Sequence, residues 1–130
     1  MAGRQPGDLR LRDRCLAAIA LLLGLGLGAC TTETSLADTP CPPEGTKLTY
    51  DSFGAAFMAR RCQTCHGQRD GARKGAPEGY DFGTLDAVRA KGDRIFARAA
   101  ADNVTMPPGP DDPPAAERDQ LAEWLACGAP

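Results

Sequence analysis

The sequence has few of the side chains on which most enzymes and nucleic-acid-binding proteins depend. It contains one histidine, His66, and aromatic residues make up only 5% of its 130 residues. The 15 basic residues do not outnumber the 17 acidic ones, so no excess of positive charge favours nucleic acid. So few aromatic side chains supply little apolar mass, and small domains of this kind usually need a disulfide, a metal or a cofactor.

No apolar run in the sequence is long enough to predict a membrane-spanning helix. The longest, Cys15 to Ala29, follows a basic N-terminal stretch and is typical of a secretory signal peptide. It ends in Leu27-Gly28-Ala29-Cys30, which resembles a bacterial lipobox, so we expect residues 1–29 to be removed and Cys30 to carry lipid. The alternative is an ordinary signal peptide cleaved after Ser35-Leu36-Ala37, which would leave a soluble periplasmic protein.

The mature chain is expected to be acidic and to consist of a linker and one domain. Removal of residues 1–29 leaves 11 Lys and Arg against 15 Asp and Glu, a formal net charge of −4. Residues 30–46 are polar, with almost no apolar content apart from Cys41. We expect them to link the lipid to a domain at 47–128.

The apolar pattern of the mature chain predicts three helices and no strand. The expected elements are a helix from Thr49 or Asp51 into Cys62, a loop at 67–83, a helix at 85–101 capped by Thr84, a loop at 102–114, and a helix from Pro113 or Pro114 to Ala126. Long loops in so small a domain usually indicate that another group fills its centre.

Residues 62–66 read Cys-Gln-Thr-Cys-His, the attachment signature of c-type haem. Two thiols three residues apart can form thioethers with the two vinyl groups at one porphyrin edge, and the adjacent histidine places its imidazole under the iron. We therefore expect Cys62 and Cys65 to hold one haem covalently and His66 to ligate its iron.

Two other interpretations of the cysteines remain open. A Cys-x-x-Cys redox pair is typical of a βαβ context, and the sequence predicts no such strands. A zinc site formed by Cys41, Cys62, Cys65 and Cys127 is chemically allowed, although these four lack the paired Cys-x-x-Cys spacing of zinc knuckles. Absence of a covalent chromophore would favour a haem-free structural lipoprotein of this kind.

The second ligand of the iron follows by elimination. His66 is the only histidine, so the chain cannot supply two imidazoles, and methionine is then the expected partner. Of the three methionines, Met1 leaves with the signal peptide, and Met58 lies one helical turn before the motif, on the proximal side. Met106 lies 40 residues after His66 in a loop stiffened by two following prolines. We expect Met106 to be the ligand; the alternative is a surface methionine.

Over roughly residues 47–127, the order of these features resembles a class I monohaem cytochrome c. The order is a helix, Cys-x-x-Cys-His, a glycine-rich loop, a second helix, Met106-Pro-Pro and a terminal amphipathic helix. The resemblance implies an all-α fold: a small three-to-four-helix cytochrome c-like domain wrapped around one covalent haem. It also implies that the first and last helices cross, which would place Gly54 and Met58 near Leu121, Trp124 and Leu125.

The resemblance further implies contacts around the haem. In this family a proline carbonyl soon after the motif often accepts the Nδ1–H of the proximal histidine. Pro77 stands at about the right distance from His66, although it serves equally well as a turn residue. Arg73, Lys74 and Tyr80 are the candidates for contacts with the haem propionates.

Cys41 and Cys127 flank the expected domain. Outside the cytoplasm two spare cysteines tend to pair, and crossing of the first and last helices would bring these two close. We expect a disulfide between them; the alternatives are two separate thiols or an intermolecular bridge.

The motif and the resemblance predict a one-electron carrier, not an enzyme, that uses one haem c with His/Met ligation in the bacterial cell envelope. We expect a monomer anchored by its N-terminal lipid to a membrane on the periplasmic side, with redox proteins of the envelope as partners. The alternative is a haem-based sensor or small peroxidase-like catalyst in which Met106 is a labile ligand. A peroxidase-like catalyst usually needs a distal histidine or arginine, and the sequence contains no second histidine.

Overall fold

The computed structural model describes residues 33–67, 73–110 and 112–130, which belong to one unit, Glu33–Pro130. The expected signal peptide at 1–29 and the expected lipidation site Cys30 lie outside the described residues. Within the described part, no helix combines the length and the apolar character that crossing a membrane requires.

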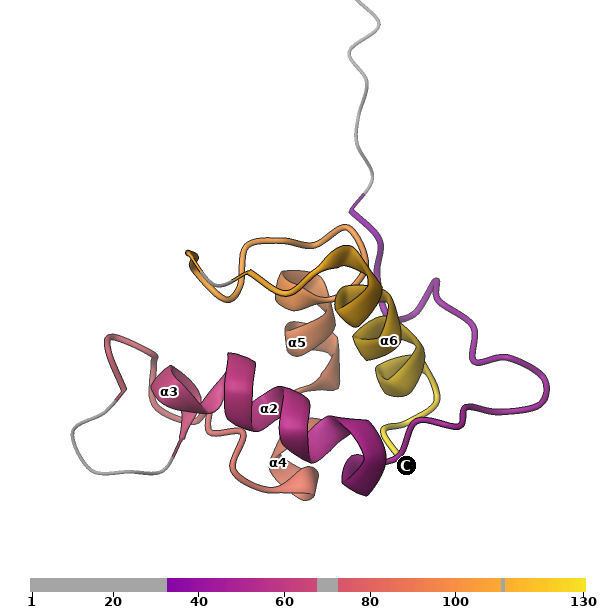
Figure 1. The fold of residues 1–130 in the computed structure, drawn as a ribbon, viewed down its shortest axis with the longest axis horizontal. Coiled ribbons are helices and arrows are strands. Elements are labelled where there is room, and N and C mark those ends of the chain that lie inside the picture. Colours follow the sequence, from indigo (N-terminus) through magenta and orange to yellow (C-terminus); the bar gives the residue numbers. More distant parts are fainter. Residues whose placement is uncertain (1–32, 68–72, 111) are drawn as a thin grey trace, which may run out of the picture. The chain divides into compact units, whose positions relative to one another are not determined.

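The described residues form helices and loops and contain no strand (Figure 1). The prediction of an all-α domain is therefore confirmed. The elements, in chain order, are a π-helical turn η1 (Tyr50–Gly54) and the α-helices α2 (Ala55–Arg61), α3 (Gln63–His66), α4 (Leu85–Ala90), α5 (Gly92–Ala99) and α6 (Ala115–Ala126).

The first helical segment, η1 continued by α2, is capped at Thr49 as expected. The Thr49 hydroxyl accepts a hydrogen bond from the Ser52 backbone N–H (3.1 Å), and the Ser52 hydroxyl accepts one from the Thr49 N–H (2.9 Å). This reciprocal capping box satisfies N–H groups that otherwise lack partners at the start of a helix. Phe57 and Met58 on α2 are fully buried, so the apolar stripe of the sequence faces the core.

The predicted helix at 85–101 is wrong as a single element, because the chain divides it into α4 and α5 at Lys91. Thr84 caps α4 as expected, its hydroxyl accepting a hydrogen bond from the backbone N–H three residues on (3.2 Å). Lys91 leaves helical geometry (φ −121°, ψ 16°), and the two helices run in different directions (Figure 1). The buried Gly92 follows, with Leu36 3.7 Å from the position of a Cβ.

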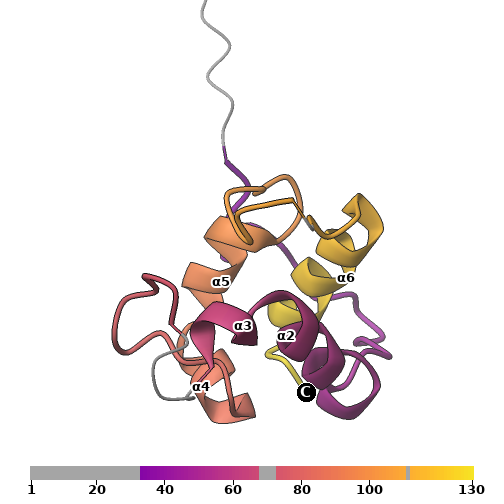
Figure 2. The same ribbon diagram turned by 60° about the vertical axis from the view of Figure 1, so that its left-hand side comes forward.

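The first and last helices cross where Gly54 meets Trp124, as the resemblance implied. A Cβ placed on Gly54 would lie 2.4 Å from Trp124 Cζ2, so only glycine permits this approach. The Phe53 ring packs edge-on against the Trp124 ring, with 6.0 Å between the centroids. At the far end of α2, Arg61 pairs with Glu117 on α6 (3.1 Å), and Figure 2 shows the two helices side by side.

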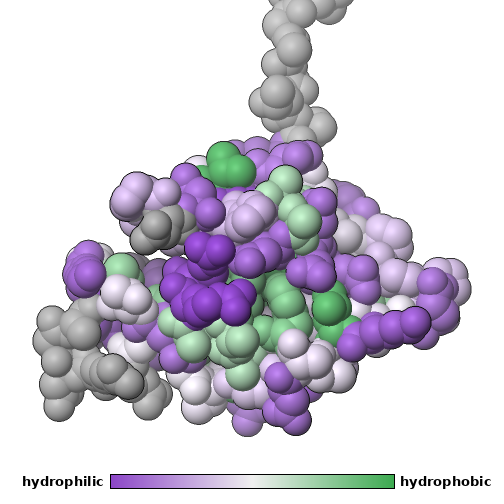
Figure 3. All heavy atoms as spheres, in the orientation of Figure 1, coloured by the Kyte–Doolittle hydropathy of each residue, from purple (hydrophilic) through white to green (hydrophobic). Residues whose placement is uncertain are grey.

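The core lies between four elements: the two crossing helices (the first helical segment and α6), α4 and α5. Its largest fully buried side chains are Trp124, Phe57, Phe96, Met58, Leu121 and Val88. On the face seen in Figure 3, hydrophobic side chains also reach the surface near the middle of the domain, beside a group of strongly hydrophilic ones. Some apolar side chains of the domain are therefore exposed at its surface and not enclosed in the core.

Residues 33–46 pack against the domain, which corrects the expectation of a linker at 30–46 and a domain that begins at 47. The Asn103 side chain donates a hydrogen bond to the Thr34 carbonyl (2.9 Å), and Leu36 packs on the core. The polar composition of the segment was misleading because most of its attachments are hydrogen bonds and a disulfide, which need little apolar surface.

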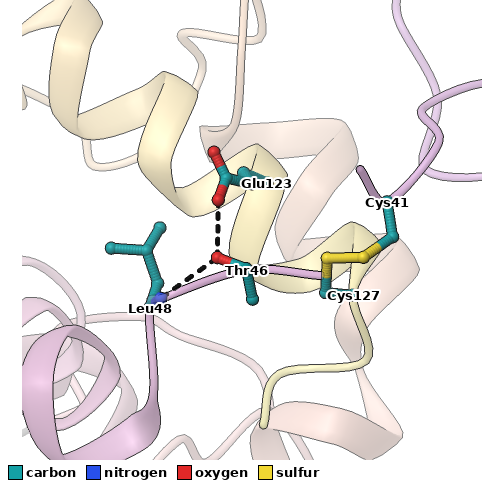
Figure 4. The surroundings of a disulfide bond; sticks show 5 residues. All are labelled: Cys41, Thr46, Leu48, Glu123 and Cys127. Atoms are coloured by element: carbon teal, nitrogen blue, oxygen red, sulfur yellow. Dashed lines mark hydrogen bonds between the residues drawn. A yellow bond between two sulfur atoms is a disulfide. The ribbon is translucent and has the colours of Figure 1, made fainter. Parts of the chain in front are cut away.

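A disulfide joins Cys41 to Cys127, with 4.8 Å between the two Cα atoms (Figure 4). Beside it, the Thr46 hydroxyl donates a hydrogen bond to Glu123 on α6 (2.5 Å). The structure thus pairs the two cysteines that flank the expected domain. The bond ties the N-terminal segment to the end of the last helix.

Candidate functional site

A cavity of about 490 Å³ opens between α2 and α3 on one side, α5 on another, and the loops at 74–82 and 106–108. The volume lies within the range of about 300–1,000 Å³ that is usual for ligand pockets. Its lining is mostly apolar and includes Phe57, Phe82 and Ile95. All the residues of the attachment motif that were expected to touch a cofactor, Cys62, Cys65 and His66, also line it.

The turn between α2 and α3 presents the two cysteines and the histidine together. The Cys62 N–H donates to the Met58 carbonyl (2.9 Å), which ends α2. The Cys62 carbonyl then accepts from the N–H groups of Cys65 (3.1 Å) and His66 (2.8 Å). These bonds close one helical turn around the motif, so one turn of backbone carries all three side chains.

The His66 ring is oriented by the loop that follows it. Its Nδ1 lies 2.7 Å from the Tyr80 carbonyl oxygen, which can only accept, so Nδ1 carries the proton and Nε2 is left for a metal. The Phe82 ring stacks on the imidazole, with 4.7 Å between centroids and 23° between planes. The prediction that Pro77 supplies the carbonyl is therefore wrong, because the loop brings Tyr80 to that place.

Hydrogen bonds fasten this loop to the motif. The Phe82 N–H donates to the His66 carbonyl (2.7 Å), and the Gln63 side chain donates to the Phe82 carbonyl (3.0 Å). Arg73, expected as a propionate contact, instead donates to Asp81 (2.5 Å) and to the Pro77 carbonyl, and it is not among the cavity-lining residues. Arg73 therefore shapes the loop.

Met106 lines the same cavity as His66, together with the two prolines that follow it. The Met106 N–H donates to the Arg98 carbonyl (2.8 Å), which holds this part of the loop against the end of α5. Met106 is 41% exposed, whereas Met58 is fully buried and does not line the cavity. Of the methionines in the described residues, only Met106 is brought to the site.

The structure adds cationic residues that the sequence analysis missed. Arg61, Arg94 and Arg98 line the cavity, as does the expected Lys74, and Tyr80 lines it too. Arg94 and Arg98 are four residues apart on α5 and so share a face of that helix, which is the pattern that would have revealed them. The cavity is therefore apolar inside and carries positive charge among its lining residues.

The geometry disfavours the two other interpretations of the cysteines. Cys41 and Cys127 are joined to each other, so they cannot complete a zinc site with Cys62 and Cys65. Among the described residues there is also no group of three or more His, Cys, Asp and Glu placed to hold a metal ion. Burial, followed by the influence of Cys65, raises the pKa of the Cys62 thiol to about 12, whereas a reactive redox thiol needs a lowered pKa.

A histidine held by a backbone carbonyl, two adjacent cysteines and a methionine at one apolar cavity define a c-type cytochrome domain, and this donor set fits haem c. The family model described as cytochrome c oxidase, cbb3-type, subunit III matches residues 52–125, more than half of the chain. The chain belongs to this family and is a c-type cytochrome. Neither the curated proteins nor the solved structures yielded a match.

Proposed function

We propose that the protein is a one-electron carrier with a single haem c, covalently attached to Cys62 and Cys65 and ligated by His66 and Met106. One observation carries the proposal: His66 and Met106 come from elements 40 residues apart and line one cavity. Membership of the c-type cytochrome family supports electron transfer by haem.

When bound, the haem supplies an iron that alternates between the ferric and ferrous states. The chain's own residues tune and protect it. The Tyr80 carbonyl fixes the tautomer of His66 and makes the imidazole a better donor. A thioether from Met106 would raise the reduction potential. Phe57 and Ile95 keep the cavity wall apolar and exclude water.

The cationic residues of the cavity are proposed to hold the two propionates of the haem. Lys74, Arg94 and Arg98 come from two different elements and line the cavity together. Arginine binds carboxylates through two parallel N–H donors, which suits a propionate. Tyr80 is a further candidate, and its ring lies under the Lys91 ammonium (4.9 Å).

The protein is proposed to act in the bacterial cell envelope, on the periplasmic side of a membrane, held by lipid on Cys30. The family supports a place outside the cytoplasm or at a membrane. A multiply acylated N-terminus anchors stably, whereas one acyl chain binds only marginally. Redox proteins of the envelope, a membrane-bound oxidase among them, are the proposed partners of a monomeric carrier.

The first experiment is an optical spectrum, oxidised and reduced, of protein made in a host that matures c-type haem. The colour should survive acid–acetone extraction, which removes haem that is not covalently bound. A low-spin spectrum with the ferric Met–iron charge-transfer band would support both covalent attachment and the methionine ligand. No covalent haem would overturn the proposal.

One observation favours a second candidate function, that of a haem-based sensor or small peroxidase-like catalyst. Met106 lies in a loop outside the helices, so no helical hydrogen bonds hold its backbone at the cavity. Binding of carbon monoxide by the reduced protein separates the two functions. A carrier should resist carbon monoxide at concentrations that saturate an open haem.

A further inference from the structure

Arg118 on α6 is a buried cation whose side-chain hydrogen bonds all go to backbone carbonyls between Ala99 and Met106. The residue is only 3% exposed. Its Nη1 lies within hydrogen-bond distance of three backbone carbonyls, those of Ala99 (2.9 Å), Asn103 (3.0 Å) and Met106 (2.8 Å), which share its two N–H donors. One nitrogen therefore joins the end of α5, the following turn and the methionine.

These bonds complete a set that restrains the backbone of Met106 on two sides. Its N–H is held by the Arg98 carbonyl (2.8 Å), which also accepts from the Thr105 hydroxyl (3.2 Å). Its carbonyl is held by Arg118 from the opposite helix. Removal of Arg118 would leave the Arg98 contacts on one side and leave the Met106 carbonyl without this donor.

The burial of Arg118 is not explained by stability alone. Among the described residues, its Nη2 has no hydrogen-bond partner and forms only a long ion pair, 3.6 Å, with the exposed Asp112. A buried charge without full satisfaction costs free energy, and an apolar side chain of similar volume often serves a core as well or better. A guanidinium can donate hydrogen bonds to several carbonyls at once, which an apolar group cannot do.

We propose that Arg118 is a positioning residue that holds the Met106 loop in the conformation that presents the thioether to the cavity. The inference rests on the proposed ligation by Met106. Without Arg118, the loop would hold the Met106 thioether at the cavity for less of the time. An added ligand would then take its place more easily.

The test compares haem-loaded variants of the full chain. Arg118→Met removes the donors and keeps an unbranched apolar side chain, and Arg118→Lys keeps the charge but not the planar fork. The readouts are the ferric Met–iron charge-transfer band and the affinity of the ferric protein for imidazole. We expect Arg118→Met to weaken the band and to bind imidazole about tenfold more tightly or more, because hydrogen bonds to a charged donor are lost. Arg118→Lys should show a smaller change in the same direction.

Two controls separate positioning from general loss of stability. Arg60→Met removes an exposed arginine of α2 that pairs with Glu117 of α6 (3.6 Å), and it should match the wild type. Val88→Ala creates a space in the core away from the cavity, so it should lower the melting temperature without changing the imidazole affinity.

The outcomes distinguish this inference from the proposed function. If the wild type lacks the Met–iron band, ligation by Met106 is wrong and the role of Arg118 falls with it. If the wild type shows the band and both Arg118 variants keep its intensity and the wild-type imidazole affinity, only the role of Arg118 is wrong. If Arg118→Met does not accumulate with haem, the imidazole affinity of Arg118→Lys tests the role of Arg118: an affinity equal to that of the wild type would contradict it.

Discussion

The carbonyl oxygen of Tyr80 lies 2.7 Å from Nδ1 of His66, fourteen residues earlier in the chain. A loop thus sets the proton position and the orientation of the histidine that the motif supplies. Phe82, two residues further on, stacks on the same ring and returns a hydrogen bond to the His66 carbonyl. The His66 ring is thus held by the loop that follows it, whereas Met106 is held through its backbone by Arg98 and Arg118.

Replacement of Met106 tests the sixth ligand. Met106→Ala should keep the haem, because the cysteines and His66 are untouched, but lose the Met–iron band and lower the reduction potential. Axial ligands set haem potentials over about 0.8 V, so a redox titration will resolve the change. Reduced Met106→Ala should also bind carbon monoxide. An unchanged spectrum and potential would contradict the assignment, and Met58→Leu, in the core and away from the cavity, is the matched control.

Replacement of both motif cysteines tests covalent attachment and its contribution to folding. Cys62→Ala with Cys65→Ala should carry no covalent haem, and the chain should be largely unfolded, because a small core then surrounds an unfilled cavity of about 490 Å³. Haem staining after denaturing electrophoresis and far-ultraviolet circular dichroism check the two parts. Native-like dichroism in this variant would show that the domain folds without its cofactor.

The disulfide is expected to stabilise the domain and leave the haem environment unchanged. Cys41→Ser with Cys127→Ser should lower the free energy of unfolding by at most about 4–5 kcal/mol, the chain-entropy limit for a bond across 86 residues. Denaturant unfolding measures the loss, and the optical spectrum is the internal control. A changed Met–iron band would mean that the bond also shapes the site.

Gly54 should resist any side chain. Replacing a glycine inside a helix by alanine usually stabilises the protein by about 0.5–1 kcal/mol. At Gly54, however, the new Cβ would lie 2.4 Å from the Trp124 ring. Overpacking of this kind costs about 1–3 kcal/mol, so the melting temperature should fall. Ala56→Val, on the exposed face of α2, is the control and should change the melting temperature little. A melting temperature of Gly54→Ala equal to or above that of the wild type would argue against the close helix crossing.

The lipid anchor is tested by Cys30→Ala. In the bacterial host, the variant should move from the membrane fraction to the soluble periplasmic fraction and keep the spectrum of the wild type, because Cys30 precedes the domain. Fractionation followed by haem staining checks both points. A wild-type protein that is already soluble would instead support cleavage after Ser35-Leu36-Ala37.

Features that depend on neighbouring residues could be predicted from the sequence. The attachment motif lies within one helical turn, and the caps at Thr49 and Thr84 bond to N–H groups three residues on. The end of α6 just before Gly128 has the same local origin. Such interactions are encoded in adjacent side chains, so their spacing can be read directly.

Features that depend on distant segments were missed or misjudged. The partner of His66 is Tyr80 rather than Pro77, the helix at 85–101 breaks at Lys91, and residues 33–46 join the domain. Arg94 and Arg98 at the cavity, and Arg118 behind the methionine loop, also went unrecognised.

The sequence by itself thus determined the all-α class, the local caps of the helices, and the candidate residues for haem attachment and iron ligation. Only the tertiary structure decided which carbonyl orients His66, which cations line the cavity and what holds the methionine loop. The physical reason is that these contacts join segments far apart in the chain. Many of the acceptors are backbone carbonyls, which every residue type offers, so only the packing of the whole domain decides which carbonyl is used.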